Sequence, residues 1–204
     1  MSRNVLRALG VLLALGLVLP GSAFAQEPLE YPSSGMRGGT ELGIDMAFSH
    51  NMIDGNADNI TQITLPFGGS LSPILSPHAG LRAAFYLSPR LAIEPVTSFS
   101  YAKEGEGHLT TWSFAAKVQY HFSERVTAVR PYLAAGGTFG LLDSNDSDSE
   151  SQFGVTGEFG LKIPFEDYFG LRIAGGYTRL FENDNLPTQD ILFLTVGFSV
   201  FFWK

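Results

Sequence analysis

The sequence predicts an all-β fold: an antiparallel barrel of eight strands that crosses a membrane. Two observations carry the prediction. The chain of 204 residues is 45% hydrophobic but only 16% charged, and after its first 25 residues no stretch is long and apolar enough for a membrane-spanning helix. From Thr40 to Trp203 apolar side chains alternate with small or polar ones at the period of a β-strand. A chain of this kind must either bury its apolar side chains in a core or point them from its β-strands towards lipid.

Composition narrows the function classes. The chain has no cysteine, which excludes disulfides, cysteine-ligated zinc, iron–sulfur clusters and thiol nucleophiles. Its net charge of −7, without a basic cluster, disfavours binding to nucleic acid. The 17 phenylalanines argue against a disordered chain, which would be poor in aromatic residues. The sequence therefore predicts one folded domain without a cofactor.

The N-terminus has the pattern of an export signal, predicted over residues 1–25. Arg3 and Arg7 precede an apolar run over 11–19, and small residues at 23 and 25 predict cleavage before Gln26. The run is short for a hydrocarbon core of about 30 Å, which disfavours an uncleaved membrane anchor.

The mature chain then divides into two parts. Residues 26–38 are expected to be a short periplasmic segment, and residues 39–204 the barrel. The last strand shows the alternation best, because Val196, Phe198 and Val200 face one side and Gly197 and Ser199 the other. Strands are expected at 41–48, 81–86, 91–101, 112–122, 132–141, 153–163, 169–178 and 192–202. Eight strands suffice to close a sheet on itself.

The connections alternate in length. Residues 87–90 and 164–167 read as tight turns, and 122–131 as a somewhat longer link on the same rim. The opposite rim is predicted to carry longer, mostly acidic loops at 51–59, 103–107, 143–151 and 182–190. Short turns on one rim and long loops on the other are typical of a transmembrane barrel, with the short turns in the periplasm.

A soluble β-sandwich or lipocalin-like barrel would alternate in the same way, but its outer face should be densely charged. Here the face opposite the apolar one is mostly Gly, Ala, Ser and Thr, which fits a crowded barrel interior better. Aromatic residues gather near the strand ends, where interfacial girdles are expected. The predicted girdle consists of Tyr101, Trp112, Tyr120, Phe122, Phe169, Tyr177 and Phe202.

The segment 60–67 reads as a further short strand. Single-chain bacterial barrels use even strand numbers, so we interpret it as an above-membrane extension of the first hairpin or a folded lid. Residues 68–77 would then lead to the second strand. A ten-stranded barrel is the alternative, and the role of residues 60–77 stays open.

The alternating, aromatic-ended segment Val196–Phe202 resembles the last strand of the small outer-membrane barrels of the OmpA/OmpX-like superfamily, although Trp203 and Lys204 follow the aromatic residue. The resemblance spans the mature chain. It implies a location in the bacterial outer membrane, contact with membrane lipid and lipopolysaccharide, and recognition by the barrel-assembly machinery. We also expect a monomer.

Four acidic and four basic side chains fall on the inner face of the predicted barrel. They are Glu41, Asp45, Arg82, Glu94, Lys117, Glu158, Lys162 and Arg172. Isolated buried charges are very costly, so these side chains should pair. The favoured interpretation is a network that plugs the barrel, because eight strands leave little more room than their own side chains need. The alternative is a small-solute channel with Glu94, Lys117, Glu158 and Arg172 at its constriction.

The densest acidic run lies in the predicted loop 143–151. Asp143, Asp146, Asp148 and Glu150 are a weak candidate site for a divalent cation, but the run lacks the glycine and the spacing of an EF-hand. A solvated outer loop is the favoured interpretation.

An enzymatic interpretation rests on one short motif. His121 and Ser123 resemble the His-x-Ser element of lipid A deacylases, in which a histidine activates a serine. The motif falls at the short-turn rim, whereas that chemistry attacks lipid in the outer leaflet. We therefore predict a non-enzymatic barrel that serves envelope structure or surface-loop interactions.

Overall fold

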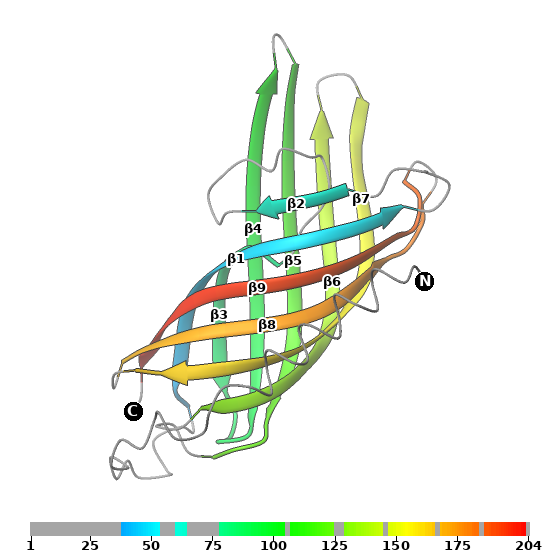
Figure 1. Cartoon of the computed structure of the whole chain (residues 1–204). Helices are drawn as coiled ribbons and strands as arrows, with labels where there is room; N and C mark the ends of the chain where they lie inside the picture. Colours follow the sequence, from blue (N-terminus) through cyan, green and yellow to red (C-terminus); the bar gives the residue numbers. More distant parts are fainter. Residues whose placement is uncertain are drawn as a thin grey trace.

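A computed structural model shows the barrel in Figure 1. It describes residues 38–53, 60–64, 78–104, 107–124, 129–144, 147–165, 168–183 and 186–202. The predicted export signal and all but the last residue of the predicted periplasmic segment lie outside this part of the chain. Among the described residues, no helix is long and apolar enough to cross a membrane.

In the described part of the chain, nine strands form a single sheet. They are β1 (Thr40–Ile53), β2 (Ile60–Thr64), β3 (Gly80–Tyr86), β4 (Leu91–Glu104), β5 (Gly107–His121), β6 (Arg130–Ser144), β7 (Ser147–Pro164), β8 (Phe169–Leu180) and β9 (Gln189–Phe202). All eight strands expected from the alternation are present, and most of them run further than predicted towards the long-loop rim.

The sheet closes into a barrel through its first and last strands. Sequential strands from β3 to β9 pair antiparallel, and β1 pairs with β9 from Thr40↔Phe202 to Ile53↔Gln189. Because β1 also pairs with β3, the closed ring contains β1 and β3 to β9. The predicted eight-stranded antiparallel barrel is confirmed, and the ten-stranded alternative is wrong.

The extra strand β2 shares one edge of β1 with β3. Its five residues pair from Asn51↔Ile60 to Ala47↔Thr64, above the stretch of β1 that pairs with β3. This arrangement matches the expected extension of the first hairpin. It also accounts for the shortness of β3, which begins level with Asp45 of β1, about halfway along the barrel wall.

Two hairpins rise above the rest of the barrel at the long-loop end (Figure 1). The β4–β5 ladder continues to Glu104↔Gly107, and β6 and β7 pair to Ser144↔Ser147 with a register shift near the tip. The expected loops at 103–107 and 143–151 are therefore largely strand. The backbone of a hairpin can stay paired where its side chains are not buried. The polar composition of these segments, which predicted loops, therefore did not mark where the pairing ends.

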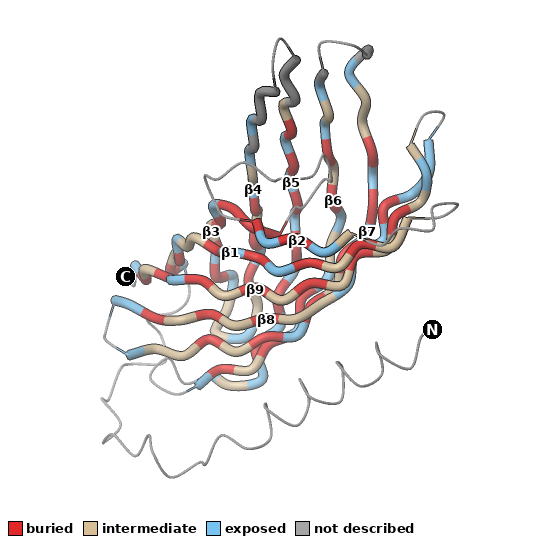
Figure 2. Tube along the Cα trace, turned by 45° about the horizontal axis from the view of Figure 1, so that its top comes forward, coloured by how far each residue is buried: buried red, intermediate tan, exposed pale blue. Residues whose placement is uncertain are grey.

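Burial alternates along every wall strand, as Figure 2 shows. Phe198 exposes 57% of its surface to the outside of the barrel, whereas the next residue, Ser199, exposes 1%. Large apolar side chains cover the outer surface and charged ones lie inside, the reverse of a soluble protein. All seven side chains of the predicted aromatic girdle are on the outer surface, at the two ends of the wall: Tyr120, Phe122, Phe169 and Phe202 towards the short turns, Tyr101, Trp112 and Tyr177 towards the hairpins.

Candidate functional site

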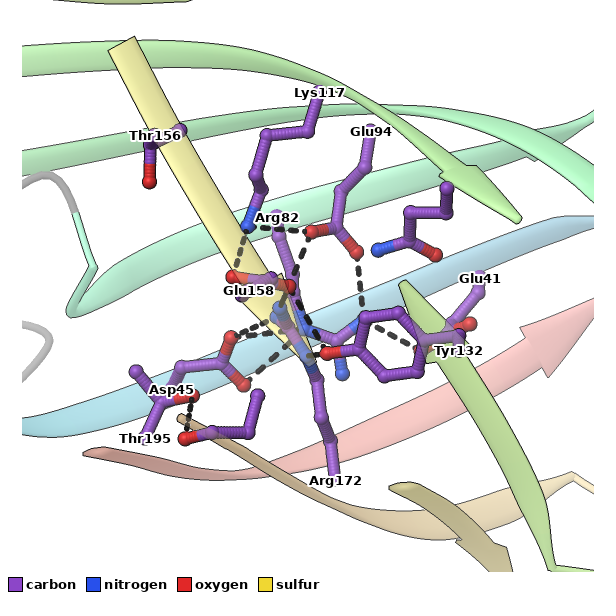
Figure 3. A network of polar contacts seen from close by, with 12 residues as sticks. Glu41, Asp45, Arg82, Glu94, Lys117, Tyr132, Thr156, Glu158, Arg172 and Thr195 are labelled. Carbon is purple, nitrogen blue, oxygen red and sulfur yellow. Dashed lines mark hydrogen bonds and ion pairs between the residues drawn. The ribbon is translucent and has the colours of Figure 1, made fainter. Parts of the chain in front are cut away.

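The eight charged residues predicted to face inward come together in one network inside the barrel. Figure 3 labels all of them except Lys162. They extend from six strands, and every one of these side chains is at most 4% exposed. Strand alternation alone places them inside, because each occupies the inward phase of its strand.

Two arginines hold the acidic residues of β1. The Arg82 guanidinium lies 2.5 Å from a Glu41 oxygen and 3.0 Å from an Asp45 oxygen. Arg172 contacts the same Asp45 carboxylate at 2.5 Å and also pairs with Glu158. Asp45 therefore lies between two guanidinium groups, which joins β1 to both β3 and β8.

Two lysines complete the network. Lys117 Nζ lies 3.0 Å from Glu94 and 2.9 Å from Glu158. Lys162 Nζ donates to Glu41 at 2.6 Å and to the side-chain oxygen of Gln119 at 2.9 Å. Each carboxylate of the network contacts at least two cations, so the contacts form one connected cluster rather than separate pairs.

The network balances four carboxylates against four cations. In a region of low dielectric constant each buried charge needs a partner of opposite sign and aligned hydrogen bonds. Glu94 is the least tightly held acid: its oxygens lie 3.0, 3.4 and 3.6 Å from Lys117, Arg172 and Arg82, and neither accepts an aligned hydrogen bond among the described residues.

Two tyrosines also belong to the network, although the alternation predicted only its charged members. The Tyr86 hydroxyl donates to Glu41 at 2.8 Å. The Tyr132 hydroxyl donates to Glu158 at 3.0 Å and accepts from Arg172 Nε at 2.6 Å. The available signal was a large polar aromatic residue at an inward position that is otherwise occupied by small side chains.

A further arginine lies below the network, at the short-turn end. Arg130 is buried, donates from Nη2 to the Pro89 carbonyl at 2.7 Å, and its guanidinium carbon lies 5.5 Å from the centre of the Tyr86 ring. The His121 ring packs between Tyr86 and Tyr132, with ring centroids 5.5 and 5.7 Å away. Arg130 and His121 therefore form a floor beneath the network, against the rings of its two tyrosines.

The structure does not assemble the His121–Ser123 pair as a nucleophile and its base. His121 is fully buried, and neither ring nitrogen has a hydrogen-bond partner among the described residues, Ser123 included. A histidine that activates a serine must reach its hydroxyl. The Ser123 carbonyl instead accepts a hydrogen bond from Arg130 Nε at 3.4 Å.

The candidate cation site is described only in part. Asp143 lies on β6 and Glu150 on β7, whereas Asp146 and the side chain of Asp148 fall outside the described part of the chain. In that part, no group of three or more His, Asp or Glu side chains is arranged to hold a metal ion.

A closed eight-stranded barrel with an apolar outer face and a charged interior defines a transmembrane β-barrel protein of the outer-membrane class. Residues 11–201 match the family described as the outer membrane protein beta-barrel domain, and the chain belongs to that family. The family places the protein in the bacterial outer membrane.

One solved structure supports the fold, and two others are similar at lower scores. Neisserial surface protein A is similar to this chain with a TM-score of 0.56 and 14% identity over 80% of this chain and 99% of that one. Ail, the attachment invasion locus protein of Yersinia pestis, has a TM-score of 0.48 and 15% identity over 82% and 100%. OprG from Pseudomonas aeruginosa has a TM-score of 0.49 and 13% identity over 84% and 99%. A search of curated proteins found no match.

Proposed function

We propose that this protein is a non-enzymatic outer-membrane barrel whose lumen is plugged by the charge network, and that it acts through envelope structure and its projecting hairpins. The observation that carries the proposal is the network itself. Eight buried charges from six strands cancel one another and contact one another across the interior.

The plug follows from the geometry and from electrostatics. Arg82 and Arg172 both reach Asp45, so side chains from three strands meet across the lumen. A solute that passed this level would have to separate ion pairs in a region of low dielectric constant, where each separated charge is costly. Arg130 and His121, which pack against the rings of Tyr86 and Tyr132, add a second layer beneath it.

The projecting hairpins supply the outward surface. β4–β5 and β6–β7 extend above the barrel (Figure 1), and the described outward side chains along them include Phe99 and Trp112, whose rings pack edge to face at 5.5 Å. Lipid and lipopolysaccharide would contact this surface where the hairpins leave the membrane. Paired strands hold such a surface in a fixed shape.

The second candidate function is a small-solute channel, and the loose hold on Glu94 favours it. Glu94 has three ion-pair partners at 3.0 to 3.6 Å, so its carboxylate can exchange partners more easily than the other acids can. A channel would require such an exchange to open a path past Arg172 and Lys117.

Conductance in planar bilayers separates the two functions. The mature chain is compared with the Glu94→Ala/Arg172→Ala variant, which removes one acid and one base and leaves the interior neutral. A plugged barrel is silent as wild type and conducts only in the variant. Stable conductance steps of the wild-type protein would contradict the plug and establish the channel. The control is Arg179→Ala/Asp190→Ala, which removes an ion pair of 3.6 Å that lies outside the lumen.

A further inference from the structure

The chain enters β3 from inside the barrel. His78 and Ala79 come directly before Gly80, the first residue of β3, and both are buried. Gly80 lies level with Asp45 of β1, about halfway along the barrel wall. The neighbours of β3 in the sheet are β1 and β4, yet His78 contacts β8 and β9, which lie beyond β1. The chain therefore crosses the lumen before it joins the wall.

The passage from the lumen to the wall requires a glycine at position 80. A Cβ added to Gly80 would lie 2.1 Å from the carbonyl oxygen of Thr97 on β4. Thr97 is also paired with Phe114 of β5, so the β4 backbone cannot move away without disturbing the ladder on its other side. Gly80 therefore fixes the point at which the chain turns into the barrel.

One side chain docks this segment onto the opposite wall. The His78 ring stacks on the Phe193 ring, with centroids 3.5 Å apart and an angle of 11° between the planes. Its Nε2 shares a hydrogen bond of 2.9 Å with the Thr178 hydroxyl. Phe193 and Thr178 lie on the inward faces of β9 and β8, and both are buried. The attachment thus consists of one ring stack and one hydrogen bond.

A chain of hydroxyl groups determines which ring nitrogen carries the proton. Thr178 donates to the Thr156 hydroxyl at 2.7 Å, and Thr156 donates to the Tyr177 carbonyl at 3.5 Å. The Thr178 oxygen therefore accepts from His78, and Nε2 is the protonated nitrogen. Nδ1 has no hydrogen-bond partner among the described residues. A second proton would bind at Nδ1 and make the ring a cation.

The surroundings of the ring do not offset a positive charge. The charged groups that act on His78 are Lys117 of β5, Glu158 of β7 and Arg172 of β8. The Glu158 carboxylate is already held by both of these cations. Asp190, the titratable residue of β9, lies outside the lumen, and the inward residues of β1 at this level are a serine and an asparagine. A cationic ring would therefore lie near two other cations without a free carboxylate.

We propose that His78 is an acid-sensitive latch, which holds the chain inside the lumen at neutral pH and releases it in acid. A histidine in water has a pKa of about 6.5, whereas the docked ring would have to accept its second proton beside two cations. Protons therefore bind preferentially to the released form, and docking weakens as the pH falls below about 6.5. While the docked ring stays neutral, the docking equilibrium falls about tenfold per pH unit. The latch acts above the charge network, so it holds whether or not that network conducts.

Thiol labelling can measure the release, because the chain contains no cysteine. Ser49→Cys places a reporter directly opposite Phe193, at a fully buried position. The variant is refolded in lipid vesicles and labelled with dipyridyl disulfide, a small reagent that stays reactive in acid. Each rate is divided by the rate for glutathione at the same pH. The corrected rate should rise about 100-fold between about pH 7.5 and about pH 4.5.

Two variants in the Ser49→Cys background remove the titration and each keep part of the contact. His78→Gln retains a donor for Thr178, and His78→Phe retains a ring that can stack on Phe193. In both, the corrected rate should be the same at the two pH values, whatever its level. Ser199→Cys is the matched control in the charge network, where Ser199 donates to Glu41 at 2.8 Å. Its corrected rate should not follow the rise at position 49.

Each contrary outcome overturns the latch. A corrected rate at position 49 that does not rise in acid shows that the docked ring is not released. A rise that persists in either His78 variant shows that another group carries the titration. Equal rises at positions 49 and 199 show that acid opens the whole interior instead. The proposed plug is tested separately, by the bilayer conductance of the wild-type protein.

Discussion

Removing Arg172 should destabilise the barrel more than almost any other single truncation. Its guanidinium contacts Asp45 at 2.5 Å, Glu94 at 3.4 Å and the carboxylate of Glu158. Arg172→Ala leaves four buried carboxylates with three cations. Asp45 then depends on Arg82 alone, and Glu158 on Lys117.

The magnitude follows from the kind of contact that is lost. Breaking a buried ion pair by removing one partner costs about 3–5 kcal/mol, because the remaining charge stays buried without compensation. The Tyr132 hydroxyl adds little to this cost, since it retains Glu158 as a partner at 3.0 Å. The expected loss is a factor of roughly 10² to 10⁴ in the unfolding equilibrium.

The assay is equilibrium unfolding in urea from lipid vesicles, followed by tryptophan fluorescence and by the gel shift of the folded barrel. Arg179→Ala is the matched control, because Arg179 lies on the same strand but is 46% exposed, 3.6 Å from Asp190. An exposed pair of this kind contributes about 0–1 kcal/mol. The double variant Arg172→Met/Glu158→Gln, which restores neutrality, should recover part of the stability. Equal losses for Arg172→Ala and Arg179→Ala would refute the view of the lumen as a tightly coupled charge network.

Three further predictions concern the wall and the rim. Gly136→Ala should lower the free energy of unfolding by about 1–3 kcal/mol, because the added Cβ would overlap a carbonyl oxygen of β5. At Gly137 the nearest atom to an added Cβ is 3.9 Å away, so Gly137→Ala should change the free energy of unfolding by less than about 0.5 kcal/mol. Similar yields of the heat-modifiable form for both variants would contradict this. Phe198→Arg, on the outer face, should cost about 2–4 kcal/mol in urea unfolding, and an unchanged midpoint would mean that this face does not meet lipid. His121→Ala/Ser123→Ala should leave the lipid A composition of expressing cells unchanged, and an altered acylation pattern on mass spectrometry would revive the hydrolase interpretation.

Alternation predicted the wall of the barrel because it follows from local geometry alone. The inward phase of Glu158 and Lys162 is fixed by their spacing on one strand, and the same holds for Glu41 and Asp45. The inward positions carry equal numbers of acidic and basic side chains. This balance predicted that they pair, although the neighbouring strands of each residue were not known. The family resemblance and the count of eight strands both rest on this alternation.

Which acidic side chain pairs with which basic one depends on the register between strands, and the sequence of a single strand does not determine that register. Arg172 and Asp45 are 127 positions apart, and only the stagger between strands brings them to one level. The ends of the hairpins were missed because a polar residue such as Asp143, which is exposed on β6, suggests a loop by its type, although backbone pairing continues past it. The pairing of both β2 and β3 with one edge of β1 has no local sequence signal either, since it depends on how the strands are placed along β1.

The sequence separation within the network has a consequence for how the barrel forms. Glu41 and Lys162 are 121 positions apart, and their contact requires strands from both ends of the chain. An intermediate that lacks the last hairpin, β8–β9, also lacks Arg172, so its interior holds four carboxylates against three cations where lipid cannot solvate the excess charge. Such an intermediate is strongly disfavoured in the bilayer, and the energy gained when the charges meet arrives only as the ring closes. The network thus couples neutralisation of the interior to completion of the wall.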